Sequence, residues 1–325
     1  MVVLKSPKNS KTVDLHTDAQ ISFLKSDRSN VSLEDFDYLN LNMVEENDYS
    51  FPKELEFEWE ADADGVLQIS EDEDFSTFIS IHGHNRAKVI NLKCGTRYFW
   101  RVVCKDEVSD IFYFNTADRY PRFIKIDGIT NVRDCGGRKT VSGKRIRQGL
   151  LYRGSELNSH LTVTECGLKT MRDCLNIKSV LDLRGATEEV EDVYKGEYIN
   201  IPVIPYGEWF SHPETARKVF EYIFDKNNYP LYFHCWGGAD RTGTLAFLLG
   251  ALLGESYESL IDDYEITTVS AIEVRSRNSK NQFIPFWNKF QSFEGDTLQE
   301  KAISYLLSIG ISEAAIKDFQ EFMLY

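Results

Sequence analysis

A ten-residue stretch, HCWGGADRTG at 234–243, lies between two apolar runs. The run before it, PLYFHC at 230–235, has the length and composition of a buried parallel strand. The run after it, RTGTLAFLLGALLG at 241–254, is apolar on nearly all sides, as a buried helix is. A strand, a glycine-containing loop and a helix in this order predict a parallel α/β core around the loop.

The position of this loop before a helix gives it an electrostatic character. The first N–H groups of a helix lack intrahelical partners, and the positive end of the helix dipole faces the preceding loop. Gly237 and Gly238 allow the backbone to turn tightly, so that successive N–H groups face one concavity. The loop therefore predicts a cradle for a dianion. We expect its phosphate-binding residues to be Trp236, Gly237, Gly238, Ala239, Asp240, Arg241 and Thr242.

Cys235 lies at the base of this predicted cradle, and Arg241 follows it by six residues. The positive field favours the thiolate of Cys235, which is the nucleophilic form. The planar guanidinium of Arg241 can bind two phosphate oxygens at once. Thr242 can donate its hydroxyl to the thiolate, and His234 can brace the loop through backbone hydrogen bonds. These residues predict a nucleophilic thiolate beside a bound phosphate group.

Three other interpretations of the stretch fit less well. A buried cysteine ending a core strand would not need the surrounding pattern of histidine, glycines, arginine and threonine. Sulfur transferases of the rhodanese type have a loop that is typically one residue shorter before the arginine. Metal binding by His234 and Cys235 lacks a second ligand pair with suitable spacing, so we expect neither a metal nor another cofactor.

The stretch matches the Cys-x5-Arg-Ser/Thr signature of cysteine-dependent phosphatases. Together with residues 128–162, VLDLRG at 180–185 and LIDDYEITT at 260–268, it resembles the bacterial tyrosine/serine protein phosphatase family. The resemblance covers about residues 121–325. It implies a central mixed sheet flanked by helices, with Cys235 as nucleophile and Arg241 binding phosphate. Two positions depart from the family pattern: Ala239 replaces a lysine that helps phosphoinositide phosphatases bind extra phosphates, and Cys135 replaces a leucine.

The general acid is less clearly marked than the nucleophile. The resemblance implies Asp240, whose alternative role is to hold the loop by accepting backbone hydrogen bonds. Glu208, in IPYGEWF, lies where compact dual-specificity phosphatases carry their acid, and it is the second candidate. Four further residues are expected to support the site. Asp182 and Arg184 end a predicted strand, and Arg133 and Asp134 either organise the site or form a structural ion pair.

The first 120 residues indicate a separate all-β domain. Short runs rich in aromatic and β-branched residues alternate with turn signals, a pattern typical of a sandwich. The predicted strands lie at 57–61, 65–70, 77–81, 97–104 and 111–116. LKCGTRYFWRV at 92–102 resembles the fibronectin type III pattern, with Tyr98 as the corner tyrosine and Trp59 as a core tryptophan. We therefore predict a fibronectin type III-like domain with an N-terminal extension at 1–118 and a phosphatase domain at 119–325. In the second domain, Thr162 with Glu165, Ser211 with Glu214 and Thr297 with Glu300 predict capped helix starts.

The charge pattern limits the partners. Residues 1–120 hold 13 basic and 23 acidic residues, which disfavours nucleic acid and anionic membranes. Residues 121–154 hold nine basic residues, either a site for small anions or a solvated basic face. The chain has no run of 18 apolar residues, so no membrane span is expected. The six cysteines, without a CxxC pair, fit reduced thiols. The compartment stays open: cytoplasmic as the sequence stands, secreted if a signal peptide was removed.

These features predict a phosphomonoester hydrolase, foremost a protein-tyrosine phosphatase or one with dual tyrosine and serine specificity. The expected substrate is a phosphorylated protein or peptide. One alternative is an inositol phosphate or phosphoinositide phosphatase, favoured by the basic run and disfavoured by Ala239. Another is a catalytically inactive phosphate-binding module. The N-terminal domain is a candidate platform for a protein partner or for the substrate, and a spacer is the alternative.

Overall fold

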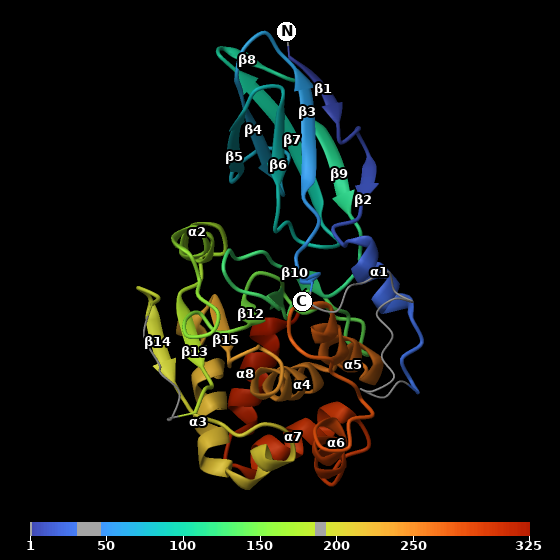
Figure 1. Cartoon of the computed structure of the whole chain (residues 1–325), viewed down its shortest axis with the longest axis vertical. Helices are drawn as coiled ribbons and strands as arrows, with labels where there is room; N and C mark the ends of the chain where they lie inside the picture. The colour runs from blue at the N-terminus through green and yellow to red at the C-terminus, as the bar shows by residue number, and fades with distance from the viewer. Residues whose placement is uncertain (1, 31–46, 186–192) are drawn as a thin grey trace. The chain divides into compact units, whose positions relative to one another are not determined.

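The computed structural model describes residues 2–30, 47–185 and 193–325, and the chain divides into two compact units. The first unit comprises Met1–Thr17 and Pro52–Arg122. The second comprises Asp18–Phe51 and Phe123–Tyr325. Figure 1 colours the chain by residue number and labels the elements of both.

The first unit is built from β-strands in two sheets. A three-stranded antiparallel sheet has the order β1-β3-β6, and a second sheet has the order β2-β9-β7-β4-β5, with β8 paired to β7. The strand bounds are β1 Val3–Ser6, β2 Lys11–Val13, β3 Leu55–Glu60, β4 Gly65–Ser70, β5 Ile79–Gly83, β6 Arg86–Val89, β7 Arg97–Cys104, β8 Glu107–Val108 and β9 Phe112–Thr116. The predicted strands at β3, β4, β5, β7 and β9 are therefore present.

One apolar core serves both sheets of this unit. Trp59 from β3 and Trp100 from β7 lie in the same buried cluster, with exposed fractions of 2% and 0%. The hydroxyl of Tyr98 accepts a hydrogen bond of 2.9 Å from the backbone N–H of Lys93, five residues upstream. This bond is the kind that a corner tyrosine makes in immunoglobulin-like sandwiches. The likeness to fibronectin type III domains stays a prediction.

The segment from Asp18 to Phe51 departs from the predicted domain boundary, because it belongs to the second unit. Its helix α1 (Asp18–Lys25) places Phe23, which is fully buried, in a cluster with Phe123, Ile266 and Val269. Burial of an aromatic side chain contributes roughly 1.5–3 kcal/mol, which a surface linker would not gain. The sequence placed this segment in the N-terminal domain because Phe123, Ile266 and Val269, which Phe23 contacts, lie far away along the chain.

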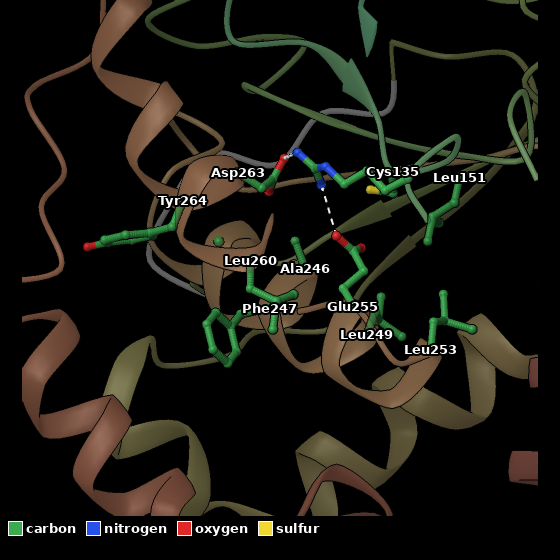
Figure 2. A pocket seen from close by; sticks show the side chains of 13 residues that line it. Cys135, Leu151, Ala246, Phe247, Leu249, Leu253, Glu255, Leu260, Asp263 and Tyr264 are labelled. Atoms are coloured by element: carbon green, nitrogen blue, oxygen red, sulfur yellow. Dashed lines mark hydrogen bonds and ion pairs between the residues drawn. The ribbon is translucent and has the colours of Figure 1, made fainter. Parts of the chain in front are cut away.

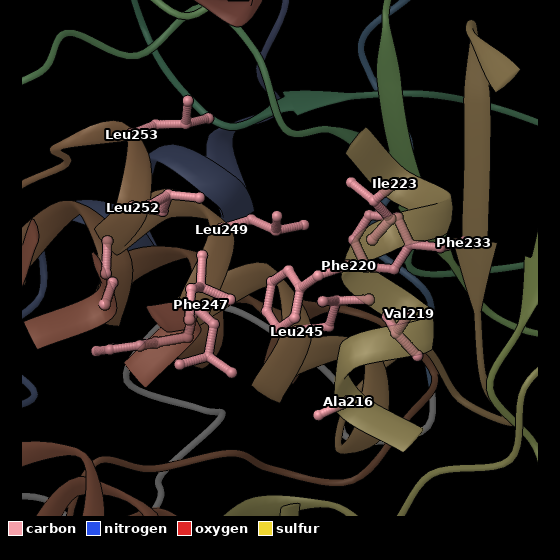
Figure 3. Packing of buried hydrophobic residues seen from close by; sticks show 14 of the residues in the cluster. Ala216, Val219, Phe220, Ile223, Phe233, Leu245, Phe247, Leu249, Leu252 and Leu253 are labelled. Atoms are coloured by element: carbon pink, nitrogen blue, oxygen red, sulfur yellow. The ribbon is translucent and has the colours of Figure 1, made fainter. Parts of the chain in front are cut away.

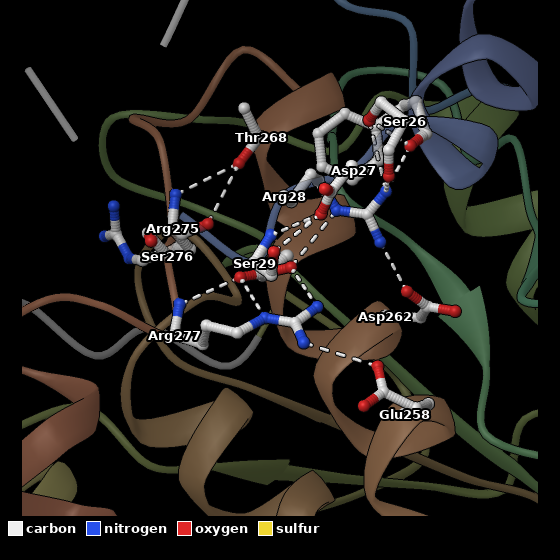
Figure 4. A network of polar contacts seen from close by, with 12 residues as sticks. Ser26, Asp27, Arg28, Ser29, Glu258, Asp262, Thr268, Arg275, Ser276 and Arg277 are labelled. Atoms are coloured by element: carbon white, nitrogen blue, oxygen red, sulfur yellow. Dashed lines mark hydrogen bonds and ion pairs between the residues drawn. The ribbon is translucent and has the colours of Figure 1, made fainter. Parts of the chain in front are cut away.

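Arg28 fixes the same segment by charge. Its guanidinium donates to Asp262 and, at 3.1 Å, to Glu265, both on α5 (Tyr257–Glu265). Figure 4 shows Arg28 directed toward Asp262, and Arg277 toward Glu258, along one face of this helix. Arg28 is 7% exposed, so its ion pairs are better shielded from water than those of a surface arginine. The segment is thus attached to the second unit by both an apolar and a polar contact.

The second unit contains a mixed sheet with the order β10-β11-β12-β15-β13-β14. The strand bounds are β10 Arg122–Phe123, β11 Arg133–Asp134, β12 Leu151–Gly154, β13 Ser179–Asp182, β14 Glu197–Asn200 and β15 Leu231–His234. The pairs β12–β15, β15–β13 and β13–β14 are parallel, whereas β11 runs antiparallel to β12. The predicted strand that ends near Asp182 and Arg184 is found as β13, and the predicted buried strand at 230–235 is found as β15.

The register of the parallel strands gathers their carboxyl ends at one edge. His234, the last residue of β15, pairs with Gly154 of β12 and with Asp182 of β13. Ligands of open α/β sheets bind beyond this edge of the strands. The edge therefore places the loop after β15 next to residues that follow β12 and β13.

Helices complete the core of this unit. Their bounds are α2 Glu165–Lys169, α3 Pro213–Phe224, α4 Arg241–Leu253, α5 as given above, α6 Phe283–Gln291, α7 Leu298–Ser308 and α8 Glu313–Met323. Helix α4 is buried along nearly its whole length, as its sequence predicts, and ends at Gly254 with a positive φ of 86°. Figure 3 shows Leu245 and Leu249 of α4 packed with Val219 and Phe220 of α3. No described helix is long and apolar enough to cross a membrane.

Only one of the three predicted capping boxes is present as predicted. Thr297 and Glu300 form both reciprocal bonds at the start of α7. Helix α2 is capped by Thr164, and α3 begins at Pro213 after His212 without a side-chain cap. The cap of α2 is thus Thr164 rather than the predicted Thr162, because the hydroxyl of Thr164 accepts from the N–H of Gly167.

The attachment of α1 predicts the effect of one substitution. Phe23→Ala removes an aromatic ring from the cluster of Phe123, Ile266 and Val269 and should lower the stability of the second unit by about 3–5 kcal/mol. Lys25→Ala, on the exposed side of the same helix, should change it by less than ~0.5 kcal/mol. Hydrogen exchange with mass spectrometry measures each unit separately. Unchanged protection of α5 in Phe23→Ala would contradict the assignment of this segment to the second unit.

Candidate active site

The predicted strand, loop and helix are all present around Cys235. The cysteine follows β15 directly, is 3% exposed, and lies at the carboxyl edge of the parallel strands. Arg241 is the first residue of α4, a helix of 13 residues, and Asp240 occupies its cap position. The loop is therefore bounded by a buried strand on one side and by the positive end of a buried helix on the other.

The carbonyl groups of three consecutive loop residues are each held by a donor from another segment. Trp236 accepts from the N–H of Glu156 (2.8 Å), Gly237 from the side-chain amide of Asn131 (2.9 Å), and Gly238 from Arg153 (2.7 Å). In a planar trans peptide the N–H points opposite to the C=O. The N–H groups of residues 237, 238 and 239 consequently point away from these donors, toward the side where an anion would bind. They donate no hydrogen bond to any other described residue.

Gly238 is required by this backbone. Its φ is +68°, and a Cβ at this position would lie 2.4 Å from the carbonyl carbon and oxygen of Gly154. Gly237 is less constrained, because a Cβ there would meet only the side chain of Ile272 at 3.0–3.3 Å. The loop passes so close to the end of β12 that only glycine fits at 238.

Asp182 and Arg184 form a buried polar cluster beside the loop. Both oxygens of Asp182 accept hydrogen bonds from Arg184, and the guanidinium also donates to Glu156 at 2.9 Å. Burial raises the pKa of Asp182. The nearby His234 and the hydrogen bonds from Arg184 and Tyr198 lower this pKa by more than burial raises it, so the net shift is downward. Since the N–H of Glu156 holds the Trp236 carbonyl, this cluster supports the loop indirectly.

His234 bridges this cluster and the loop. Its Nδ1 lies 3.0 Å from the carbonyl oxygen of Cys235 and 3.9 Å from Asp182. The predicted bracing of the loop by His234 through the backbone is thus present. The hydroxyl of Thr242 is fully buried and has no hydrogen-bond partner among the described residues, so the predicted bond to the Cys235 thiol is not formed here.

Asp240 is bound by a residue that the sequence analysis did not identify. Arg275 donates to one oxygen of Asp240 at 2.7 Å and to the other at 3.1 Å, and the Tyr206 hydroxyl also donates to the first. Burial raises the pKa of Tyr206, and Tyr264 and Asp240 add to the rise. A general acid must carry a proton on a carboxyl oxygen, yet both oxygens of Asp240 accept from a guanidinium. This geometry is typical of a carboxylate that positions its neighbours.

Glu208 differs from Asp240 in its surroundings. It lies in the short 3-10 helix Tyr206–Ser211, is exposed, and makes no hydrogen bond to another described residue. The backbone N–H of Tyr206, which starts this helix, donates to Thr244 of α4 at 3.0 Å. The segment that carries Glu208 therefore begins against the first turn of the helix that follows the loop.

Arg133 and Asp134 do not pair with each other. Arg133 donates to Asp263 of α5 at 2.9 Å, whereas Asp134 accepts from the backbone N–H groups of Gly136 and Gly149. The interpretation as a mutual ion pair is wrong, because the two side chains of adjacent strand residues point to opposite faces. Arg133 and Asp263 lie 130 residues apart in the chain, and no local pattern linked them.

The rim of the loop carries an aromatic pair. The Trp236 side chain is 43% exposed, and its ring meets His160 edge-on with centroids 5.4 Å apart. No cluster of three or more His, Cys, Asp or Glu side chains suited to a metal is found in the described parts of the chain.

Comparison with known proteins places this geometry in a family. The sequence profile described as the tyrosine phosphatase family matches residues 124–304, more than half of the chain. The chain belongs to the tyrosine phosphatase family.

A curated relative agrees with this assignment. The "Putative tyrosine-protein phosphatase" of Cupriavidus necator is 26% identical over an alignment of 174 residues, and the alignment covers 43% of this chain. The chain spans about three fifths (61%) of that protein's length. Two solved structures of the catalytic core of Siw14 also match, each at 18% identity. The first, described as the PP-IP phosphatase SIW14 from S. cerevisiae in complex with citrate, has a TM-score of 0.30 and covers 41% of this chain and 76% of that one. The second has a TM-score of 0.33 and covers 49% and 88%.

The basic run at 121–154 of this phosphatase-family chain was predicted to be an anion site or a solvated face, and part of it is neither. Four of its nine residues are buried and hydrogen-bonded inside the protein, so they form neither a solvated face nor an open anion site: Arg122, Arg133, Arg138 and Arg153. Arg145 and Arg147 donate to the carbonyls of Gly137 and Phe322. Local charge counting missed the partners of the four buried arginines because they lie 30 to 130 residues away in the sequence.

Gly238→Ala tests the close approach of the loop to β12. The added methyl group should cost at least ~2 kcal/mol of stability, through the positive φ and the clash with Gly154, and should weaken binding of inorganic phosphate at least tenfold. Gly237→Ala is the matched control, with a smaller expected effect because Ile272 can move. Urea unfolding and calorimetric phosphate titration provide the two measurements. Equal effects of the two substitutions would contradict the special requirement for glycine at 238.

Proposed function

We propose that the chain is a cysteine-dependent phosphomonoester hydrolase that acts on phosphotyrosine in proteins or peptides. The observation that carries this proposal is the outward anchoring of three consecutive loop carbonyls between Cys235 and Arg241. It turns the following N–H groups away from the three donors, toward the side where they can stabilise the oxygens of a phosphoryl group. Preorganised donors of this kind are usually the largest contribution to catalysis.

In the proposed reaction the thiolate of Cys235 attacks phosphorus in line with the leaving oxygen. An S–P bond forms, the P–O bond to the substrate breaks, and a general acid donates a proton to the departing oxygen. Arg241 and the loop N–H groups stabilise the equatorial oxygens. Water then attacks the phosphocysteine, releasing inorganic phosphate and restoring the thiol. Asp240 and Glu208 are the two candidates for this general acid, and only one of them transfers a proton in the scheme.

The aromatic rim and the internal charges favour an aryl phosphate as substrate. Trp236 offers an exposed aromatic face next to the loop, against which a tyrosyl ring can stack. An inositol phosphate would need several cations around one site. The buried arginines of the 121–154 run are already paired, and Ala239 supplies no charge. A catalytically inactive phosphate-binding module would not need the Cys235 thiol, so its presence favours the enzyme.

We further propose that the first unit is a fibronectin type III-like domain that serves as a platform for a protein partner. Its core tryptophans and the hydroxyl bond of Tyr98 support the fold. Its acidic composition suits a basic protein surface better than nucleic acid.

The first experiment measures phosphate release from phosphotyrosyl, phosphoseryl and phosphothreonyl peptides, inositol phosphates and phosphoinositides. Phosphotyrosyl peptides should be preferred, and Cys235→Ser should lower turnover by at least 10³-fold while still binding inorganic phosphate. Circular dichroism checks that the variant is folded. Preferred release from inositol phosphates would replace the proposed substrate. Binding of phosphopeptides without any release would identify a phosphate-binding module instead.

The general acid is identified by its dependence on the leaving group. A variant without the acid should lose about 10²-fold in kcat on phenyl phosphate, whose leaving oxygen needs a proton, and far less on p-nitrophenyl phosphate. The arrangement of Arg275 predicts this signature for Glu208→Gln. Asp240→Asn should instead affect both substrates equally, because Asp240 holds Arg275 and Tyr206. The reverse pattern would assign the acid to Asp240.

A further inference from the structure

Asp263, on α5, lies at the centre of a buried cluster of charges behind the loop. One of its oxygens accepts from Arg133 and from Arg138, each at 2.9 Å, and the other accepts from Arg153 at 2.5 Å. Arg133 and Arg153 are fully buried, and Asp263 is 6% exposed. Burial raises the pKa of Asp263, but the three guanidinium groups lower it far more. The pKa of this carboxyl therefore lies well below its usual range. A single carboxylate thus orients three arginines.

Two paths of hydrogen bonds lead from Asp263 to the loop. In the first, Arg153 binds Asp263 with one nitrogen and donates to the Gly238 carbonyl with another, at 2.7 Å. In the second, Arg133 binds Asp263 and donates to the side-chain oxygen of Asn131. The amide nitrogen of Asn131 then donates to the Gly237 carbonyl at 2.9 Å. Two of the three outward loop carbonyls are therefore held by groups that Asp263 orients.

We propose that Asp263 is a positioning residue for phosphate binding and turnover, which sets the direction of the loop N–H groups through Arg153 and through Arg133 with Asn131. This inference rests on the proposed phosphatase function. Without the charge of Asp263, Arg153 loses the partner that fixes its guanidinium plane. The Gly238 carbonyl can then rotate, and the N–H of Ala239, in the same peptide plane, turns away from the phosphate.

The cluster also supplies charge. Three arginines face two carboxylates, Asp263 and Glu255, so one positive charge is left over behind the loop. Buried charge acts at short range with little screening and favours a dianion in front of the loop. Removal of the negative charge of Asp263 raises this surplus, yet the proposal predicts weaker phosphate binding, because the direction of the N–H groups dominates. The two effects have opposite signs and are distinguishable by experiment.

Glu255 provides a matched control within the same cluster. Figure 2 shows Asp263 and Glu255 among the residues that line one pocket. Its volume of about 20 Å³ is large enough for one water molecule. Glu255 is 5% exposed and pairs with Arg138 at 3.6 Å, but none of its contacts reaches a loop carbonyl. Loss of either carboxylate removes one buried negative charge from an arginine. Only the loss of Asp263 disturbs the loop.

The experiment compares Asp263→Asn with Glu255→Gln in the full chain. Both substitutions should lower the unfolding temperature, as the loss of a buried ion-pair partner does. For the folded proteins, Asp263→Asn should lower kcat on p-nitrophenyl phosphate at least tenfold. In the Cys235→Ser background it should weaken tungstate binding, measured by calorimetry, by a similar factor. Glu255→Gln adds the same surplus of positive charge without disturbing the loop, so it should not weaken tungstate binding or lower kcat by more than twofold. Wild-type kcat and tungstate affinity in Asp263→Asn, or equal losses in Glu255→Gln, would overturn the proposal.

Arg153→Lys keeps the test decisive if Asp263→Asn does not fold. Lysine retains the positive charge beside Asp263, but its single nitrogen cannot hold the planar bridge from Asp263 to the Gly238 carbonyl. Tungstate affinity and kcat should again fall at least tenfold, and unchanged values would contradict the proposal. Tungstate binding separates this inference from the proposed function. If the wild-type chain hydrolyses no phosphate ester while Asp263→Asn still weakens tungstate binding, the positioning role stands and the enzyme function fails.

Discussion

The outward hydrogen bonds of the loop carbonyls are the contacts on which the site depends. Three donors hold them: the backbone N–H of Glu156, the amide of Asn131 and the guanidinium of Arg153. Each net bond contributes only about 0.5–1.5 kcal/mol, or about 1.5–3 kcal/mol where the donor is charged. Their combined effect is geometric. They fix the peptide planes of the loop before any ligand arrives, so that binding requires little reorganisation.

The three donors come from separate parts of the chain. One of them, Asn131, is contacted by the end of the segment before Pro52, which belongs to the second unit. Ser50 lies 3.2 Å from the hydroxyl of Thr130, and it accepts from the backbone N–H of Asn131 at 3.0 Å. Asn131 in turn holds the Gly237 carbonyl. The end of the 18–51 segment therefore contacts the residue that anchors the loop. A catalytic fragment starting at residue 119 would lack this contact.

The sequence predicted the parts of the site that depend on neighbours in the chain. The strand at β15, the turn at Gly238 and the buried helix α4 follow from composition and spacing over residues 230–254, and all are present. The capping box of Thr297 with Glu300 is equally local and is confirmed. The box of Ser211 with Glu214 failed because a 3-10 helix occupies Tyr206–Ser211, and α3 starts after it.

The partners of the charged residues could not be predicted in the same way. Asp263 meets Arg133 and Arg153 across 130 and 110 residues, and Arg275 meets Asp240 across 35. A count of local charge treats Arg133 and Arg153 as part of a basic surface, whereas the fold buries both side chains. The motif LIDDYEITT contained Asp263, but its two adjacent aspartates have different partners: Asp262 pairs with Arg28 and Asp263 with the arginine cluster. Only the packing of α5 distinguishes them.

The pairing of these internal charges bears on which phosphate esters the site can bind. Arg275 is neutralised by Asp240, and the arginines behind the loop are neutralised except for one charge by Asp263 and Glu255. With Ala239 in the loop, Arg241 is the cation that the proposed mechanism assigns to the phosphoryl group. One guanidinium and a set of backbone N–H groups balance a single dianion. A ring with several phosphates would bring further negative charges to a site whose other arginines are already paired, and their desolvation would be uncompensated.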